Sequence, residues 1–214
     1  IMATEAGADG ITAHLREDRR HIVDEDIARI MDNIDVPLNL EMAATTEMTA
    51  IAVRHRPHAA CIVPEKREER TTEGGLDAAR GGAKLSDTVA ELKDAGIRVS
   101  LFIAPETAQL EAAQDLGVPV VELHTGTYCD LTGEARLAEL EKIRAAVELA
   151  DRMGIECHAG HGLTFNSVKL IAGIPNIREL NIGHFLIAEA IFTGLPDAIK
   201  EMKKLIREAR LTVY

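Results

Sequence analysis

The stretch Asp94-Ala95-Gly96-Ile97-Arg98-Val99-Ser100-Leu101 carries the pattern that decides the fold, because a helical segment ends at a glycine and a β-rich run follows at once. A glycine just after a helix adopts the left-handed conformation that closes the helix. The same joint occurs at Gly7, Gly117 and Gly154. This recurrence predicts strands that alternate with helices, which is typical of a parallel sheet with right-handed crossovers.

Seven β-rich runs follow one another along the chain, at residues 10–15, 37–42, 58–64, 98–104, 118–125, 155–161 and 179–184. Helical patterns lie between and after them, the longest at 131–153 and the last at 195–210. A doubly wound sheet remains possible, but so many units in a row favour a (β/α)₈ TIM barrel with extra helices. We therefore expect residues 1–214 to form a single barrel domain with seven of the eight strands visible and the first strand missing from this chain.

Composition excludes several classes of protein. The 214 residues carry 24 Lys and Arg against 35 Asp and Glu, a net charge of −11, and only 3% are aromatic. An acidic, aromatic-poor chain is a poor match for nucleic-acid binding. Its three cysteines form no CxxC pair, which is typical of a reducing compartment. The sequence contains no stretch of about 18 apolar residues, the length that a membrane-spanning helix needs. We expect a cytoplasmic protein without nucleic-acid or membrane partners.

Titratable side chains stand at the ends of nearly every predicted strand. In a barrel, the catalytic groups lie at the C-terminal ends of the strands. Six of the eight histidines fall in or just after such an end. For any single histidine, a hydrogen-bonded structural role is the competing interpretation. The residues concerned include His14, Glu41, Glu65, Glu122, His124, His158, His161 and His184.

Glu41 is the most specific of these candidates. It closes the run Pro37-Leu38-Asn39-Leu40-Glu41-Met42, where a carboxylate is costly without a partner. A carboxyl held in such a place has a raised pKa and suits general base catalysis. The alternative is a buried ion pair with Arg16, Arg19 or Arg20.

Two glycine motifs suggest phosphate binding. Gly160-His161-Gly162 and Asn181-Ile182-Gly183-His184 end the last two predicted strands, and the second leads into a short helix predicted at 185–190. Barrels commonly bind phosphate on backbone N–H groups at such a helix N-terminus. The alternative is that these are turn glycines, since short glycine motifs are weak signals.

The segment 64–77 is long for a connection between a strand and a helix, and its Gly74-Gly75 pair favours a lid over the site. A solvated surface loop is the alternative. We expect no metal, because His158 and His161 are three residues apart on a predicted strand and should point to opposite faces.

Seven motifs in order resemble the pyridoxine 5′-phosphate synthase family. They are His14-Leu-Arg-Glu-Asp-Arg-Arg-His21, Asn39-Leu-Glu-Met42, Val63-Pro-Glu-Lys-Arg67, Thr71-Thr-Glu-Gly-Gly-Leu-Asp77, Glu122-Leu-His-Thr-Gly126, Ala159-Gly-His-Gly-Leu-Thr164 and Glu179-Leu-Asn-Ile-Gly-His184. The resemblance implies a cytoplasmic, homo-octameric barrel enzyme that needs no cofactor. It implies condensation of 1-deoxy-D-xylulose 5-phosphate with 3-amino-2-oxopropyl phosphate to pyridoxine 5′-phosphate, with release of phosphate and water.

The resemblance also implies roles for individual residues. The implied catalytic residues are His14 and Glu41 as proton acceptors, His161 as a proton donor and Glu122 as a stabiliser of the transition state. The implied binding residues are Arg16, His21 and Thr71 for the deoxyxylulose phosphate, and Gly162, Gly183 and His184 for the amino-ketone phosphate.

The chain departs from the family in one respect. The family's first strand carries an Asn-x-Asp-His run, and no such run precedes Ile1. If that strand is absent, we expect an open seam between the first and last strands, and weak or no activity from these residues alone.

Two other interpretations stay open at this point. One is a different phosphate-binding barrel, such as a phosphosugar epimerase or an aldolase, although the strand runs contain no lysine for a Schiff base and Lys66 lies just beyond one. The other is a non-catalytic barrel fragment that serves only in assembly.

Overall fold

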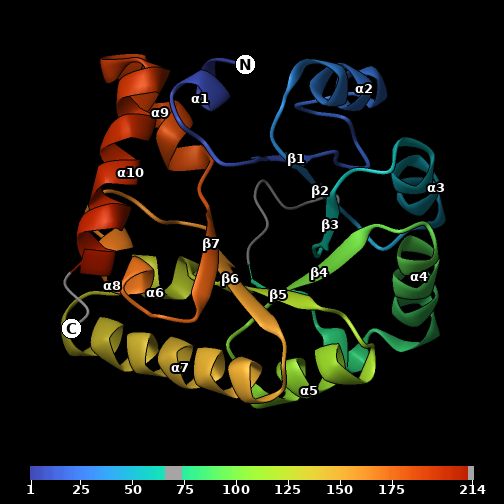
Figure 1. Ribbon diagram of the computed structural model, residues 1–214. Coiled ribbons are helices and arrows are strands. Elements are labelled where there is room, and N and C mark those ends of the chain that lie inside the picture. The colour runs from blue at the N-terminus through green and yellow to red at the C-terminus, as the bar shows by residue number, and fades with distance from the viewer. Residues whose placement is uncertain (66–73, 212–214) are drawn as a thin grey trace.

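The computed structural model describes residues 1–65 and 74–211. Within these ranges, seven parallel strands follow one another in chain order across a single sheet, which curls around its own axis with helices outside it (Figure 1). The expected barrel-type α/β fold is therefore confirmed, as a curled sheet of seven strands. The strands are β1 (Ile11–His14), β2 (Leu38–Met42), β3 (Ala59–Ile62), β4 (Arg98–Ile103), β5 (Val120–His124), β6 (Glu156–Gly160) and β7 (Ile177–Asn181).

Helices connect the strands and cover the convex face of the sheet. They are α1 (Met2–Glu5), α2 (Asp24–Asn33), α3 (Thr46–His55), the 3₁₀ turn η1 (Ala78–Arg80), α4 (Gly82–Asp94), α5 (Thr107–Asp115), α6 (Gly126–Asp130), α7 (Gly133–Arg152), α8 (Val168–Ala172), α9 (His184–Thr193) and α10 (Leu195–Leu211). None of the described helices is long and apolar enough to cross a membrane.

The glycine joints behave as the sequence predicts. Gly7, Gly96, Gly117 and Gly154 all have positive φ, between 64° and 104°. Only glycine adopts this conformation without steric cost, so each joint stops a helix and turns the chain into the next strand.

The last predicted strand is misplaced in sequence. It was expected at 179–184, but β7 begins earlier, at Ile177, and ends at Asn181. Ile177 is fully buried and pairs with Cys157 of β6, so the sheet itself extends the strand backwards. The helix expected at 185–190 is the longer α9, which begins at His184.

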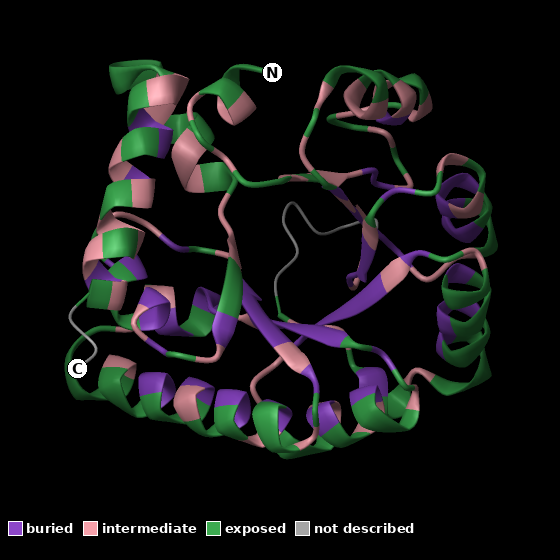
Figure 2. Cartoon of the chain, in the orientation of Figure 1, coloured by how far each residue is buried: buried purple, intermediate pink, exposed green. Residues whose placement is uncertain are grey.

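Two faces of the sheet differ in chemistry. The convex face packs aliphatic residues of the strands against the helices, and Figure 2 shows the central strands largely buried. The concave face carries polar side chains, because strand register places His14 beside Glu41 and Glu122 beside His158. A barrel interior is normally filled by branched aliphatic residues, so this polar interior marks the concave side as the functional one.

The strands β1 and β7 form the two edges of the sheet. Across the gap between them, the Thr12 hydroxyl and the Asn181 side-chain oxygen are 2.6 Å apart. A polar side-chain contact therefore links the edges at this level of the sheet.

Replacing Leu123 with alanine should lower the free energy of unfolding by about 2–5 kcal/mol, because it leaves a cavity in the packed convex layer. Leu123 is on β5 and is fully buried. Chemical denaturation measures the loss, with Leu137→Ala as the control, since Leu137 is 55% exposed on α7. Equal losses in the two variants would contradict this account of the core.

Candidate active site

A cavity of about 790 Å³ opens on the concave face of the sheet. The cavity runs along this face, and residues from both the N-terminal starts and the C-terminal ends of the strands line it. The titratable groups expected of a barrel enzyme are those at the C-terminal ends. Among the predicted site residues, those that line the cavity are His14, Glu41, Glu122, His161, Gly162, Gly183 and His184.

The remaining predicted residues lie elsewhere. Arg16, in the loop after β1, is 5% exposed and lies 3.8 Å from Glu65. His21 is exposed on the same loop and is close enough to His14 to lower its pKa. Thr71 falls outside the described residues, as does the middle of the predicted lid.

Glu41 lies on β2 with its Oε2 3.7 Å from Nδ1 of His14. Burial raises the pKa of Glu41 to about 7. Arg19, one of the arginines suggested as an ion-pair partner, instead binds Asp24 at 2.7 Å and Glu47 at 2.5 Å. A carboxyl with such a pKa exchanges protons near neutral pH, which is what a general base requires.

His14 is the neighbour of Glu41 across the strand pair. Burial lowers its pKa to about 4, and the charges of Arg16 and His21 act in the same direction. The imidazole is therefore neutral near pH 7, and one of its nitrogens is free to accept a proton.

Glu122 is a deeply buried carboxyl of the site, at 2% exposure. Burial raises its pKa well above the usual range, and the nearby charges of Glu41 and Glu179 raise it further. The Asn181 side-chain amide donates to its Oε2 at 2.8 Å. Both carboxyls of the cavity thus have raised pKa values, which suits them to proton transfer near neutral pH.

His161 follows β6 with a φ of 77°, which is rare for a residue with a side chain. Its carbonyl accepts a hydrogen bond of 2.6 Å from the Thr125 hydroxyl, and its ring lies 5.2 Å from the ring of His124. Burial and the nearby His161 lower the pKa of His124 to about 4.

The geometry of His161 overturns one sequence expectation. His158 and His161 were expected on opposite faces, but both line the cavity. The strand ends at Gly160, so the alternation of side chains stops there and the unusual backbone of His161 turns its ring inwards. His158 has a partner of its own, Glu156, at 2.8 Å, which favours its structural interpretation.

The two glycine motifs meet at the same end of the cavity. Gly162 has a φ of 78°, and Gly183 is the N-cap residue of α9. The N–H groups of the first turn of a helix lack carbonyl partners within it. Because Gly183 and His184 line the cavity, the N-terminus of α9 offers donors for an anion.

Sequence reasoning named Asn181 only within a glycine motif that suggested phosphate binding, and it missed the contact of Asn181 with Glu122. Its side-chain nitrogen donates to Glu122, and its side-chain oxygen accepts from the Thr12 hydroxyl. That hydroxyl is 3.5 Å from the side-chain nitrogen of Asn39. These three polar side chains come from different strands, so only the curl of the sheet brings them to Glu122. The signal available in the sequence was the spacing of polar residues two apart in the strands, because such residues point to the same face of the sheet. Within the described ranges, no group of three or more His, Cys, Asp or Glu side chains is placed to hold a metal ion.

Comparison with known proteins identifies the relatives of this chain. The family model described as "Pyridoxal phosphate biosynthesis protein PdxJ" matches residues 1–208. A pyridoxine 5′-phosphate synthase from Rhodospirillum rubrum is 66% identical over 94% of this chain and 82% of its own length. The Jannaschia sp. enzyme of the same name is 59% identical over 98% of this chain and 86% of its own.

Solved structures with much lower identity share the fold. KGPDC from Streptococcus mutans superposes with a TM-score of 0.67 at 13% identity, covering 97% of this chain and 92% of its own. Phosphoribosyl anthranilate isomerase from Thermus thermophilus gives 0.63 at 11% identity, covering 98% of this chain and 92% of its own. At such identities the likeness concerns the fold alone.

Proposed function

Because the chain belongs to the PdxJ family of pyridoxal phosphate biosynthesis proteins, whose curated relatives are pyridoxine 5′-phosphate synthases, we propose that it forms pyridoxine 5′-phosphate from two phosphorylated substrates. The substrates proposed are 1-deoxy-D-xylulose 5-phosphate and 3-amino-2-oxopropyl phosphate. Phosphate and water are released as the ring closes.

The observation that carries the proposal is the pair of cavity carboxyls with raised pKa values. The pKa of Glu41 is raised to about 7 and that of Glu122 is raised well above its usual range. Ring closure by condensation needs groups that remove protons from carbon and groups that protonate departing oxygens. Two carboxyls with raised pKa values that line the same cavity supply groups for both tasks.

The remaining side chains have tasks that follow from their positions. Neutral His14 accepts a proton beside Glu41, since its Nδ1 lies 3.7 Å from that carboxyl. His161 acts as a proton donor from its place after the end of β6. Glu122 donates a hydrogen bond to the oxygen on which negative charge develops, because a buried protonated carboxyl stabilises such an oxygen without reorganisation.

Two places on the cavity suit the phosphate groups of the substrates. The amino-ketone phosphate is proposed to bind at Gly162, Gly183 and His184, where the N-terminus of α9 begins. The deoxyxylulose phosphate is proposed to bind near Arg16 and His21, with Thr71 as a further contact. The cationic side chains of the loop after β1 supply positive charge for this phosphate. The protein as a whole is acidic, so that positive charge has to come from residues close to the site.

The direct test is to incubate the purified chain with both substrates and to follow pyridoxine 5′-phosphate by chromatography and inorganic phosphate in parallel. Equal amounts of the two products support the proposal. Phosphate released without the pyridine product would contradict it.

We further propose a homo-octamer in the cytoplasm. Ile187, Ile191 and Phe192 on α9 are 61%, 79% and 85% exposed, and such apolar surface is typical of an interface. Sedimentation equilibrium measures the assembly, and a monomer at micromolar concentration would contradict it.

Activity should rise with pH through the titration of Glu41. The base must be ionised, so below its pKa of about 7 the rate falls about tenfold for each pH unit. His14 does not set this limb, because its pKa of about 4 leaves it neutral throughout. Measuring kcat from about pH 5 to about pH 9 tests the prediction. A rate independent of pH below neutrality would argue against Glu41 as the base.

A further inference from the structure

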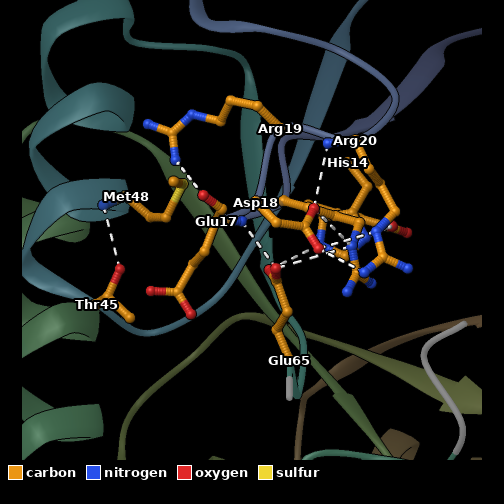
Figure 3. A network of polar contacts seen from close by, with 10 residues as sticks. His14, Glu17, Asp18, Arg19, Arg20, Thr45, Met48 and Glu65 are labelled. Carbon is orange, nitrogen blue, oxygen red and sulfur yellow. Dashed lines mark hydrogen bonds and ion pairs between the residues drawn. The ribbon is translucent and has the colours of Figure 1, made fainter. Parts of the chain in front are cut away.

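Glu65 is a buried carboxyl to which the proposed mechanism gives no task. It follows β3 at the C-terminal end of the sheet, and its side chain is 2% exposed. Figure 3 shows it directed towards the loop after β1, beneath His14. Its Oε1 accepts a hydrogen bond of 2.8 Å from the Glu17 backbone N–H and lies 3.8 Å from Nε of Arg16.

The other oxygen of Glu65 faces His14. Oε2 lies 3.4 Å from Nε2 of the imidazole, and both atoms are buried without another hydrogen-bond partner among the described residues. On its far side, Nδ1 of His14 faces Glu41 at 3.7 Å. The ring is therefore held between two carboxyls, one at each nitrogen.

A neutral imidazole carries one N–H, so this arrangement decides which nitrogen bears it. The Oε1 atom of Glu65 already accepts from Glu17 and lies beside the Arg16 guanidinium, both of which require an oxygen there. Oε2 is thus left as an acceptor aimed at His14. An N–H at Nε2 satisfies both buried atoms, and it leaves the lone pair of Nδ1 directed towards Glu41.

We propose that Glu65 is a positioning residue that fixes the Nε2–H tautomer of His14 and so makes Nδ1 the basic nitrogen of the site. The assignment of a base role to His14 rests on the proposed function, whereas the tautomer itself does not. When Nδ1 takes up a proton, the carboxylate of Glu65 stabilises the imidazolium at the opposite nitrogen. A carboxylate that orients a histidine in this way is a recurring arrangement in enzymes.

Glu65→Gln is the sharpest test, because the substitution keeps the shape and exchanges one oxygen for an amide nitrogen. The Glu17 N–H and Arg16 hold the amide oxygen on their side, so the amide nitrogen must face His14 as a donor. It can donate only to an unprotonated Nε2, which moves the imidazole proton to Nδ1. The basic nitrogen then points away from Glu41 and the substrate.

The first measurement is the tautomer of His14 by two-bond ¹⁵N–¹H correlation NMR on the purified chain at about pH 7. We expect Nε2–H in the parent chain and Nδ1–H in Glu65→Gln. His14→Gln identifies the signals. An Nδ1–H tautomer in the parent, or an unchanged Nε2–H tautomer in the variant, would overturn the proposal.

The second measurement is the steady-state rate of pyridoxine 5′-phosphate formation. We expect Glu65→Gln to lower kcat about 10- to 100-fold with little change in KM, which is typical for loss of an orienting partner. Glu65→Asp keeps both acceptor oxygens and should recover part of the rate with the Nε2–H tautomer. Glu25→Gln removes the same charge from an exposed position on α2 and should leave both readouts unchanged.

The two measurements separate the two proposals. If the parent chain forms no pyridoxine 5′-phosphate while the tautomer switches as expected, the proposed function fails and the role of Glu65 stands. If the parent is active and Glu65→Gln retains its full rate, the role of Glu65 in catalysis is wrong.

Discussion

Glu41→Gln should lower kcat for pyridoxine 5′-phosphate formation about a thousandfold, within the range of about 10²- to 10⁴-fold for loss of a general base. The amide has nearly the same size as the carboxyl but cannot accept a proton at neutral pH. The pH dependence attributed to the pKa of about 7 at Glu41 should disappear with it. The measurement is kcat across the pH range for the parent and the variant.

Stability separates this effect from misfolding. Burial raises the pKa of Glu41, so its ionised form is costly in the folded state, and a neutral amide should leave the free energy of unfolding equal or higher near pH 8. Glu106→Gln is the matched control, since Glu106 is exposed at the start of α5 on the loop after β4. A stable Glu41→Gln variant with more than about a tenth of the parent rate would remove Glu41 from the mechanism.

Gly160→Ala should lower kcat at least about 100-fold, because it displaces a catalytic group held in place by packing. A Cβ at Gly160 would collide with Oε1 of Glu122 and lie 3.0 Å from the Asn181 carbonyl oxygen. The Glu122 carboxyl would move away from the Asn181 amide that donates to it. Steady-state kinetics measures the loss.

The same collision should cost about 1–3 kcal/mol of stability, as overpacking commonly does. Glu122→Ala combined with Gly160→Ala removes the colliding carboxyl, so the double variant should lose less stability than the sum of the two single changes while remaining inactive. Gly173→Ala is the control, because Gly173 has an ordinary helical φ of −71° at the end of α8. Additive losses of stability would contradict the predicted contact.

Local sequence was sufficient to predict most of the fold. The four glycine joints and the β-rich runs between helical patterns gave the order and type of the strands, because a helix stop and a strand start depend on residues close together in the chain. The exception was β7, whose start at Ile177 depends on pairing with Cys157 of β6. The polar residues at the ends of the predicted strands likewise indicated Glu41, Glu122 and His161 as site candidates.

The contacts that tune those residues depended on the tertiary structure. The pairing of His14 with both Glu41 and Glu65, and of Glu122 with Asn181, joins residues of different strands whose distance is set by the curl of the sheet. The inward turn of His161 contradicted a rule of strand alternation, since the strand ends one residue earlier.

The sequence by itself determined that this chain alternates strands and helices, which polar residues end its strands and which family it resembles. These properties depend on residues that are close together in the chain, so they can be predicted without any distance between residues that are far apart in it. Only the tertiary structure showed that the pKa values of Glu41 and Glu122 are raised, because pKa values depend on burial and on charges from other strands. It also decided that Glu65 lies against His14, since a contact between residues 51 positions apart in the sequence exists only once the sheet has curled.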